Sequence, residues 1–181
     1  MKKLIALMIL IALCTVTLVL PASADQYRYS IQTRLIEDLA TRSGPGTQFT
    51  GCGSYRMKGQ TVTALSWAYD RGGVLWVEVE FSYGGAYRRA WTGAKRLSAG
   101  ANQLTSLPYY EGDGYMGYGT VNTRVSPRFG PGMMYAPYGD RDFYNGQQVA
   151  VLTWRDSFYL VESQWNGEIL HSWIPDWTLD F

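Results

Sequence analysis

The sequence predicts an all-β protein built from two small antiparallel β-barrels in tandem. Residues 39–46 (LATRSGPG) and 125–132 (VSPRFGPG) are near copies that lie 86 positions apart, so one unit occurs twice in the chain. Two further pairs follow in the same order, residues 59–65 with 146–152 at an offset of 87, and residues 79–97 with 161–179 at an offset of 82. Alternating apolar and polar side chains, with turns marked by glycine, are typical of strands.

The amino-terminal segment predicts an export signal. Lys2 and Lys3 precede an uncharged apolar run over residues 4–20, and Ala22-Ser23-Ala24 supplies the small residues that signal peptidase reads. We therefore expect cleavage after Ala24 and a secreted protein that is no longer attached to a membrane. The alternative is an uncleaved anchor, since a run of 17 residues is near the minimum that can span a bilayer.

Charge and cysteine content exclude several classes of protein. Two of the 16 basic residues precede the expected cleavage site, so the mature chain carries 14 basic residues against 15 acidic ones. This balance gives no field that would attract nucleic acid, and we expect no nucleic-acid partner. After cleavage Cys52 is the only cysteine, which excludes an intramolecular disulfide. We interpret it as a buried small residue, and the alternatives are a nucleophile or an intermolecular bridge.

In the first copy, we expect a first strand at residues 35–39 and a rigid corner at the Gly-Pro-Gly of residues 44–46, because proline fixes one dihedral angle while glycine frees its neighbours. The clearest strand is 74–81, along which inward side chains alternate with Trp76, Glu78 and Glu80, which are expected to face solvent. The inward set is Leu75, Val77, Val79 and Phe81. Glycines then turn the chain, and residues 86–92 form the other arm of a hairpin.

The second copy predicts the same elements. Residues 130–132 repeat the corner, and Asn166-Gly167 is a strong hairpin signal between strands at 158–164 and 168–174. The residues expected to face its core are Val149, Val151, Tyr159 and Val161. No segment longer than one turn has helical periodicity.

The length of each copy favours small barrels, because a β-sandwich usually needs about 100 residues. The predicted division is a signal peptide at 1–24, a first barrel at 25–100, a linker at 101–114 and a second barrel at 115–181. The Gly- and Tyr-rich residues 109–119 are too apolar for a free tether, so they either pack across both barrels or form the first strand of the second barrel.

Residues 39–47, 58–62 and 76–79, followed by Trp91 and Leu97, resemble the bacterial Src-homology-3-like (SH3b) domains of exported proteins in their order and spacing. The likeness is closer for the first copy, and the second copy is more divergent. The resemblance implies two SH3-like barrels in a protein of the bacterial envelope, secreted or associated with the cell wall. Such domains often accompany cell-wall hydrolases and are thought to bind peptidoglycan peptides or other proteins.

The sequence does not predict an enzyme. His171 is the only histidine, and Cys52, the one thiol that could partner it, lies in the other copy, so we expect no Cys-His pair within either barrel. No group of His, Cys, Asp or Glu has metal-ligand spacing, and the Glu-Gly-Asp-Gly stretch at 111–114 has too few oxygen ligands for calcium. We therefore expect no catalytic residue, no metal and no cofactor.

Aromatic side chains are the expected binding residues, because Trp and Tyr present rigid contact area. The candidates for an exposed groove on the first copy are Trp67, Tyr69, Trp76, Tyr83 and Tyr87. The alternative is that half of them cap the open ends of the barrel. Trp91 and Trp173 share one repeat position, which fits a core role at least as well. The expected function is recognition of cell-wall peptide or glycan by a non-catalytic exported protein. The alternatives are docking on another exported or cell-surface protein and, last, an enzyme with an unusual site.

Overall fold

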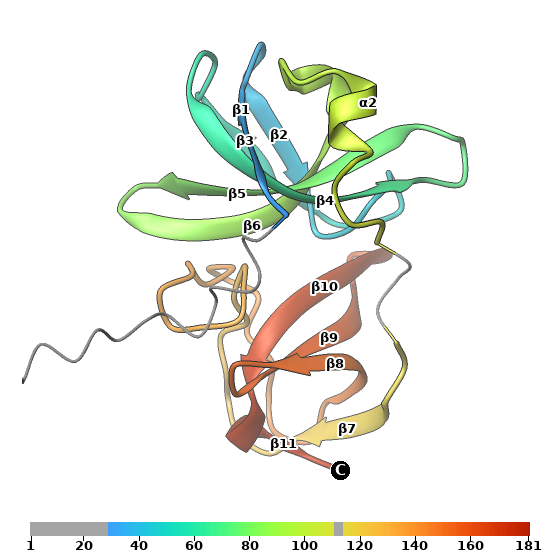
Figure 1. Ribbon diagram of the computed structural model, residues 1–181. Coiled ribbons are helices and arrows are strands. Elements are labelled where there is room, and N and C mark those ends of the chain that lie inside the picture. Colours follow the sequence, from blue (N-terminus) through green and yellow to red (C-terminus); the bar gives the residue numbers. More distant parts are fainter. Residues whose placement is uncertain (1–28, 111–113) are drawn as a thin grey trace, which may run out of the picture.

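The protein folds as two antiparallel β-sheets stacked one above the other, as a computed structural model describes for residues 29–110 and 114–181 (Figure 1). The sheets have six and five strands, which confirms the all-β prediction. We call residues 29–110 the first unit and residues 114–181 the second unit. The predicted signal segment lies outside the described residues, and within the described ranges no helix is long and apolar enough to cross a membrane.

The first unit has the strand order β1-β4-β5-β6-β2-β3. Its elements are β1 (Ile31–Arg34), β2 (Leu39–Arg42), β3 (Gly51–Tyr55), β4 (Thr61–Tyr69), β5 (Leu75–Tyr83), β6 (Ala86–Gly93), the 3-10 turn η1 (Ala94–Arg96) and the short helix α2 (Ala101–Leu104). β5 and β6 form the predicted hairpin, in which Tyr83 pairs with Ala86. The strand expected at 35–39 is wrong, because β1 ends at Arg34, the chain bends at residues 36–37, and β2 begins only at Leu39.

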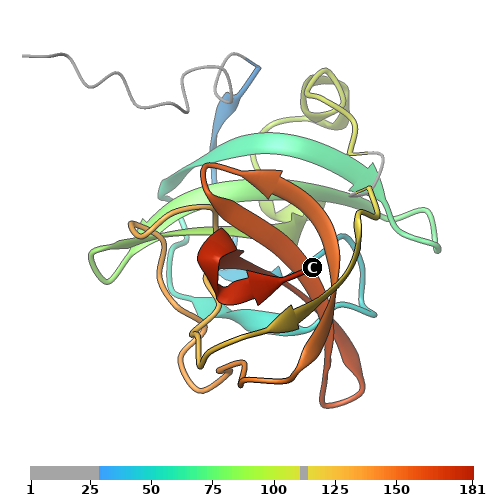
Figure 2. The same ribbon diagram turned by 90° about the horizontal axis from the view of Figure 1, so that it is seen from below.

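The second unit has the strand order β10-β9-β8-β7-β11. Its elements are β7 (Gly117–Val121), β8 (Gln148–Arg155), β9 (Phe158–Trp165), β10 (Glu168–Pro175), the 3-10 turn η2 (Asp176–Thr178) and β11 (Leu179–Asp180). The predicted Asn-Gly turn is confirmed, because Trp165 pairs with Glu168 across Asn166 and Gly167, whose φ angles are 51° and 81°. β7 is the first strand of this sheet, one of the two alternatives for the Gly- and Tyr-rich segment. Seen from below, the sheet curves strongly (Figure 2).

Each unit has its own hydrophobic core, built largely from the predicted inward positions. In the first unit Val77, Val79 and Phe81 are buried and Leu75 is half-buried. In the second unit the predicted valines are buried, and Tyr159 packs half-buried against them. The strand alternation therefore predicted the inner face of both sheets correctly.

The core of the first unit extends beyond residue 100, into the stretch expected to be a linker. Leu104 of α2 and Leu107 are buried against the core of the first unit. The backbone then pairs with β4, because the Trp67 N–H donates to the Pro108 carbonyl (3.2 Å) and the Tyr110 N–H donates to the Trp67 carbonyl (2.8 Å). Residues 101–110 are therefore a part of the first unit and not a free tether.

In each copy of the repeat, the arginine side chain forms hydrogen bonds with the Gly-Pro-Gly loop that follows it. Its Nη1 donates to two backbone carbonyls of the loop, those of Thr47 and Phe49 for Arg42 and those of Met133 and Tyr135 for Arg128. These bonds are local and equivalent, so the repeat in the sequence is also a repeat in structure.

The two units exchange equivalent contacts through these loops. Phe49 forms a parallel bridge with Ile169 of β10, and Tyr135 forms one with Tyr87 of β6. The flanking backbone bonds are Thr50 N–H to Ile169 O (2.7 Å), Ile169 N–H to Gln48 O (3.1 Å), Ala136 N–H to Tyr87 O (2.9 Å) and Tyr87 N–H to Met134 O (3.3 Å). Phe49 and Tyr135 are 86 positions apart, and Tyr87 and Ile169 are 82 apart, so they occupy equivalent positions of the repeat. The interface between the units therefore has approximate twofold symmetry.

Candidate binding groove

A groove of about 880 Å³ lies on the first unit beside Trp76. It runs over β2 and β3 to the end of β6 and η1. Small residues line much of it, namely Ala40, Gly51, Gly53, Gly93, Ala94 and Ala101. A Cβ added at Gly51 would meet no other atom within 4 Å, so there is space beside its Cα, although its carbonyl accepts a hydrogen bond from Arg141 (3.1 Å). The groove exists because these positions carry almost no side chain next to a large indole.

The indole of Trp76 is held in place by Asp70. Its Nε1 donates to Asp70 Oδ2 at 2.9 Å, while Asp70 Oδ1 accepts the N–H groups of Gly72 and Val74, each at 2.9 Å. An Asp that caps its own turn in this way is common in tight loops. Hydrogen bonds from Val74 and then from Trp76 stabilise the carboxylate and lower the pKa of Asp70. The ring is therefore oriented before any ligand arrives.

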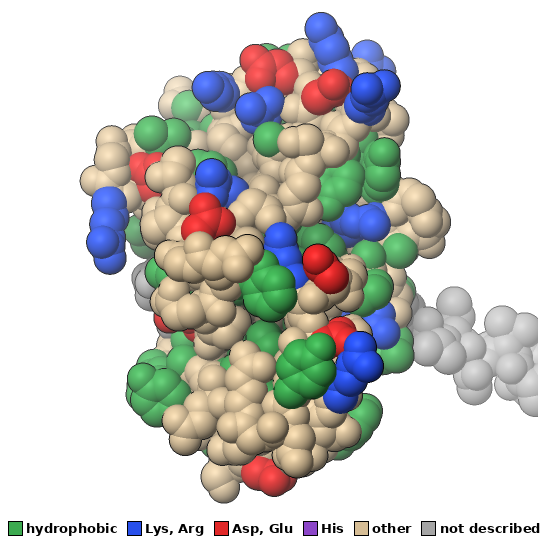
Figure 3. All heavy atoms as spheres, turned by 180° about the vertical axis from the view of Figure 1, so that it is seen from behind, with side chains coloured by type: hydrophobic (Ala, Val, Ile, Leu, Met, Phe, Trp, Pro, Cys, Tyr) green, Lys and Arg blue, Asp and Glu red, His purple; other side chains and the backbone are tan. Residues whose placement is uncertain are grey.

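Three cations line the groove, and two of them are already engaged. Arg42 binds its own loop and lies 3.6 Å from the Glu168 carboxylate. Arg96 donates to Glu37 at 2.9 Å. The exposed side chain of Lys95 has no ion pair or hydrogen bond within the described residues. Basic side chains gather at this end of the molecule, with acidic ones among them (Figure 3).

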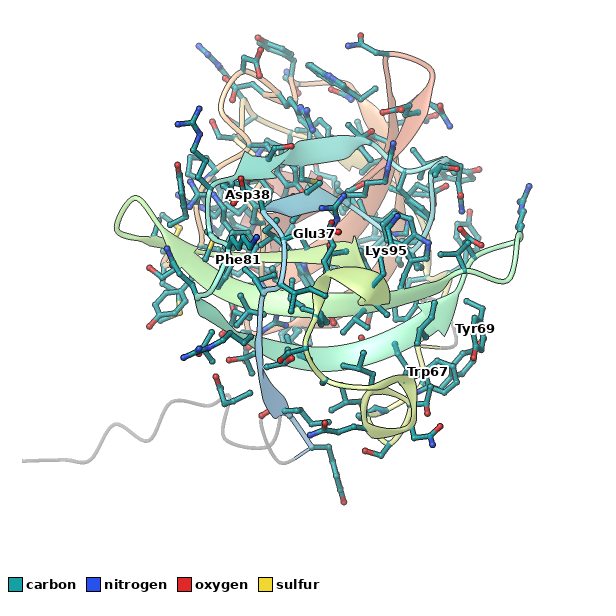
Figure 4. The ribbon with its side chains drawn as sticks, turned by 90° about the horizontal axis from the view of Figure 1, so that it is seen from above. Glu37, Asp38, Trp67, Tyr69, Phe81 and Lys95 are labelled. Carbon is teal, nitrogen blue, oxygen red and sulfur yellow. The ribbon has the colours of Figure 1, made fainter. Side chains whose placement is uncertain are left out.

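The structure does not bring the five predicted aromatic residues together, and only Trp76 lines the groove. Trp67 pairs with Val77, which places it on the core side of the sheet, and its Nε1 donates to the Leu107 carbonyl. Its ring lies 5.5 Å from that of Tyr69, and Figure 4 shows these two side chains beside each other. Trp67 therefore belongs to the packing of residues 101–110 against β4, and Tyr69 lies exposed beside it.

Tyr83 and Tyr87 lie at the other end, at the tip of the β5–β6 hairpin. The Tyr83 ring packs 4.9 Å from Tyr55, and the Tyr87 ring 6.5 Å from Tyr135 of the second unit. Both side chains remain exposed, but neither lines the groove. Sequence reasoning missed Asp70 and Lys95. Gly72-Gly73 after Asp70 is a signal for its turn, whereas nothing local marks Lys95.

The outer face of β5, expected to face solvent, lies at Glu80 against the second unit, where residues 129–136 form backbone hydrogen bonds with β6. Glu80 is 6% exposed, and its carboxylate accepts hydrogen bonds from Arg89 (2.7 Å) and from the Tyr135 hydroxyl (2.6 Å). Burial would lower the pKa of Arg89, but Glu78, Tyr135 and Glu80 outweigh it and raise that pKa. The prediction of a solvent-exposed face is wrong for Glu80, because alternation defines two faces but not what covers them.

A second cavity, of about 350 Å³, lies between the two units. Trp91 and Trp173 line it from equivalent positions and are buried, in keeping with a core role. The interface also brings Cys52 and His171 near each other, since the Tyr138 hydroxyl lies 3.6 Å from the Cys52 sulfur and donates to the His171 carbonyl. Burial raises the pKa of Cys52 to about 11, so the thiol stays protonated at neutral pH and is a poor nucleophile.

Comparisons and metal-binding geometry add no further assignment. Within residues 29–110 and 114–181, no three His, Cys, Asp or Glu side chains form a cluster that could hold a metal ion. No family model, curated protein or solved structure matches the chain. The functional argument therefore rests on the groove itself.

Proposed function

We propose that the protein is an exported, non-catalytic binding protein, SH3b-like in its first unit, that recognises cell-wall peptide or glycan through the groove beside Trp76. The observation that carries the proposal is the indole of Trp76, fixed by Asp70 and facing an open groove. A rigid aromatic wall offers contact area at little entropic cost, which is how binding hot spots are built. The export signal and the SH3b resemblance both support a cell-wall ligand.

Sedimentation with purified peptidoglycan tests this proposal. The mature protein should pellet with the wall material, and soluble wall fragments should release it. A protein that stays in the supernatant at every wall concentration would contradict the proposal.

The second candidate is docking on another exported or cell-surface protein. It is favoured by apolar side chains exposed where the units meet, namely Tyr83, Tyr87, Met133 and Met134, of which Met133 is 70% exposed. Exposed methionine adapts to varied partners. Failure to sediment with peptidoglycan, together with a binding partner that is lost in Met133→Ser, would favour this candidate.

A further inference from the structure

The groove is open in only one of the two copies of the repeat. The position equivalent to Trp76, at an offset of 82, is Phe158, which is 6% exposed and packs in an apolar cluster with Leu160 and Trp173. Pro175 takes the place of Gly93 and is buried. The second unit therefore fills with side chains the space that the first unit leaves open.

The same copy that fills the groove also lacks two of its three cations, because only Arg42 has a basic equivalent there, Arg128. At the offset of 82, Lys95 and Arg96 of η1 correspond to Trp177 and Thr178 of η2. An open groove and the two basic residues of η1 thus occur together in one copy and are lost together in the other. This association points to a ligand that is both apolar and anionic.

Among the charged residues around the groove, Lys95 is the one that can pair with an anionic ligand. The one carboxylate in the lining, Asp70, has both oxygens occupied by the hydrogen bonds from Gly72, Val74 and Trp76. Glu37 and Glu168 face Arg96 and Arg42. Lys95 is therefore the cation at this surface whose ammonium group is not already paired.

We propose that the groove binds an extended peptide of the cell wall, with its apolar part on Trp76 and a carboxylate paired with Lys95. This inference rests on the proposed function and chooses peptide over glycan, because an uncharged sugar offers an ammonium group hydrogen-bond acceptors but no opposite charge. β3 is an edge strand, paired only with β2. Arg141 donates to the Gly51 carbonyl (3.1 Å), but Gly51 and Gly53 put no side chain in the way of a chain laid along β3.

The test compares native peptidoglycan with peptidoglycan whose carboxyl groups have been amidated by carbodiimide and ammonia, which leaves the glycan strands in place. The wild-type protein should bind the amidated wall about two- to fivefold more weakly, in the range of a surface ion pair. Lys95→Gln should lose the same factor on native wall and lose nothing further on amidation. Lys58→Gln, an exposed lysine outside the groove, is the matched control and should behave as wild type.

The outcomes separate this inference from the proposed function. Equal binding of the wild type to native and amidated wall would overturn the carboxylate inference while wall binding stands. Amidation of the wall could instead weaken the binding of Lys95→Gln as much as that of the wild type. This result would show that another group binds the carboxylate, and it would also overturn the inference. Binding to neither wall would overturn both proposals.

Discussion

At the scale of single residues, Trp76 and Val77 are neighbours on one strand with opposite environments. Val77 has no exposed surface, whereas Trp76 lines the groove. Trp76→Ala should weaken wall binding about thirtyfold, or about 2 kcal/mol, as loss of an aromatic hot spot does. Circular dichroism and the melting temperature should change little.

The matched control for that substitution is Val77→Ala. It should cost about 2 kcal/mol in the free energy of unfolding, because it leaves a cavity in the core, and the folded fraction should still bind. If Trp76→Ala unfolds the protein while Val77→Ala keeps the full melting temperature, the assignment of faces on β5 is reversed.

The position of the Trp76 indole in the groove should depend on pH through the Asp70 carboxylate. Its pKa is lowered from the ordinary value of 3.8, so the carboxylate stabilises the fold above that value, and the contribution is lost as the pH falls through the lowered pKa. The indole 1H–15N resonance of Trp76 should therefore shift only below about pH 4. In Asp70→Asn that resonance should be displaced at all pH values and show no such transition.

Asp142 provides the comparison for Asp70. Hydrogen bonds from Ser126 and Arg124 lower its pKa as well, but it belongs to the second unit and does not line the groove. Asp142→Asn should leave the Trp76 titration as in the wild type. A Trp76 resonance that follows Asp142 instead would contradict the role assigned to Asp70.

At the scale of elements, the sequence predicted what depends on neighbouring residues. The Asn166-Gly167 hairpin, the β5–β6 hairpin and the inner faces of both sheets follow from turn chemistry and alternation. The sequence did not predict α2, because Leu104 and Leu107 are buried by a sheet that is distant in the sequence. In the same way Trp76 could be chosen from its strand position, whereas the groove also needs small residues on β2 and β3, which only the fold brings together.

Leu104 offers a test of that element. Leu104→Ala should lower the free energy of unfolding by about 2 to 4 kcal/mol, since the side chain is 1% exposed in the core of the first unit. Gln103→Ala, one residue earlier and exposed, should cost almost nothing. Urea unfolding followed by circular dichroism measures both. A Leu104→Ala protein as stable as wild type would mean that residues 101–110 are a tether after all.

At the scale of the whole molecule, the two units share an interface with a buried ion pair. Glu80→Leu would leave the buried Arg89 guanidinium without its nearest carboxylate, which should cost about 3 to 5 kcal/mol. Both units should then unfold at a lower urea concentration in one transition. Glu37→Leu, which breaks the exposed pair with Arg96, should cost less than about 1 kcal/mol. Two separate transitions would contradict the interdependence of the units.

The approximate twofold symmetry of the interface has a consequence for valence. Each unit extends its loop to the strand of the other, as two subunits of a symmetric dimer would, and the linkage of both copies in one chain frees them to differ. One copy keeps an open groove, while the other fills the equivalent space and supports the first across the interface. Of the two repeats that the structure describes, one thus keeps this groove. We therefore expect the proposed attachment to a surface with many ligands to be monovalent, set by a single dissociation constant and not multiplied by avidity.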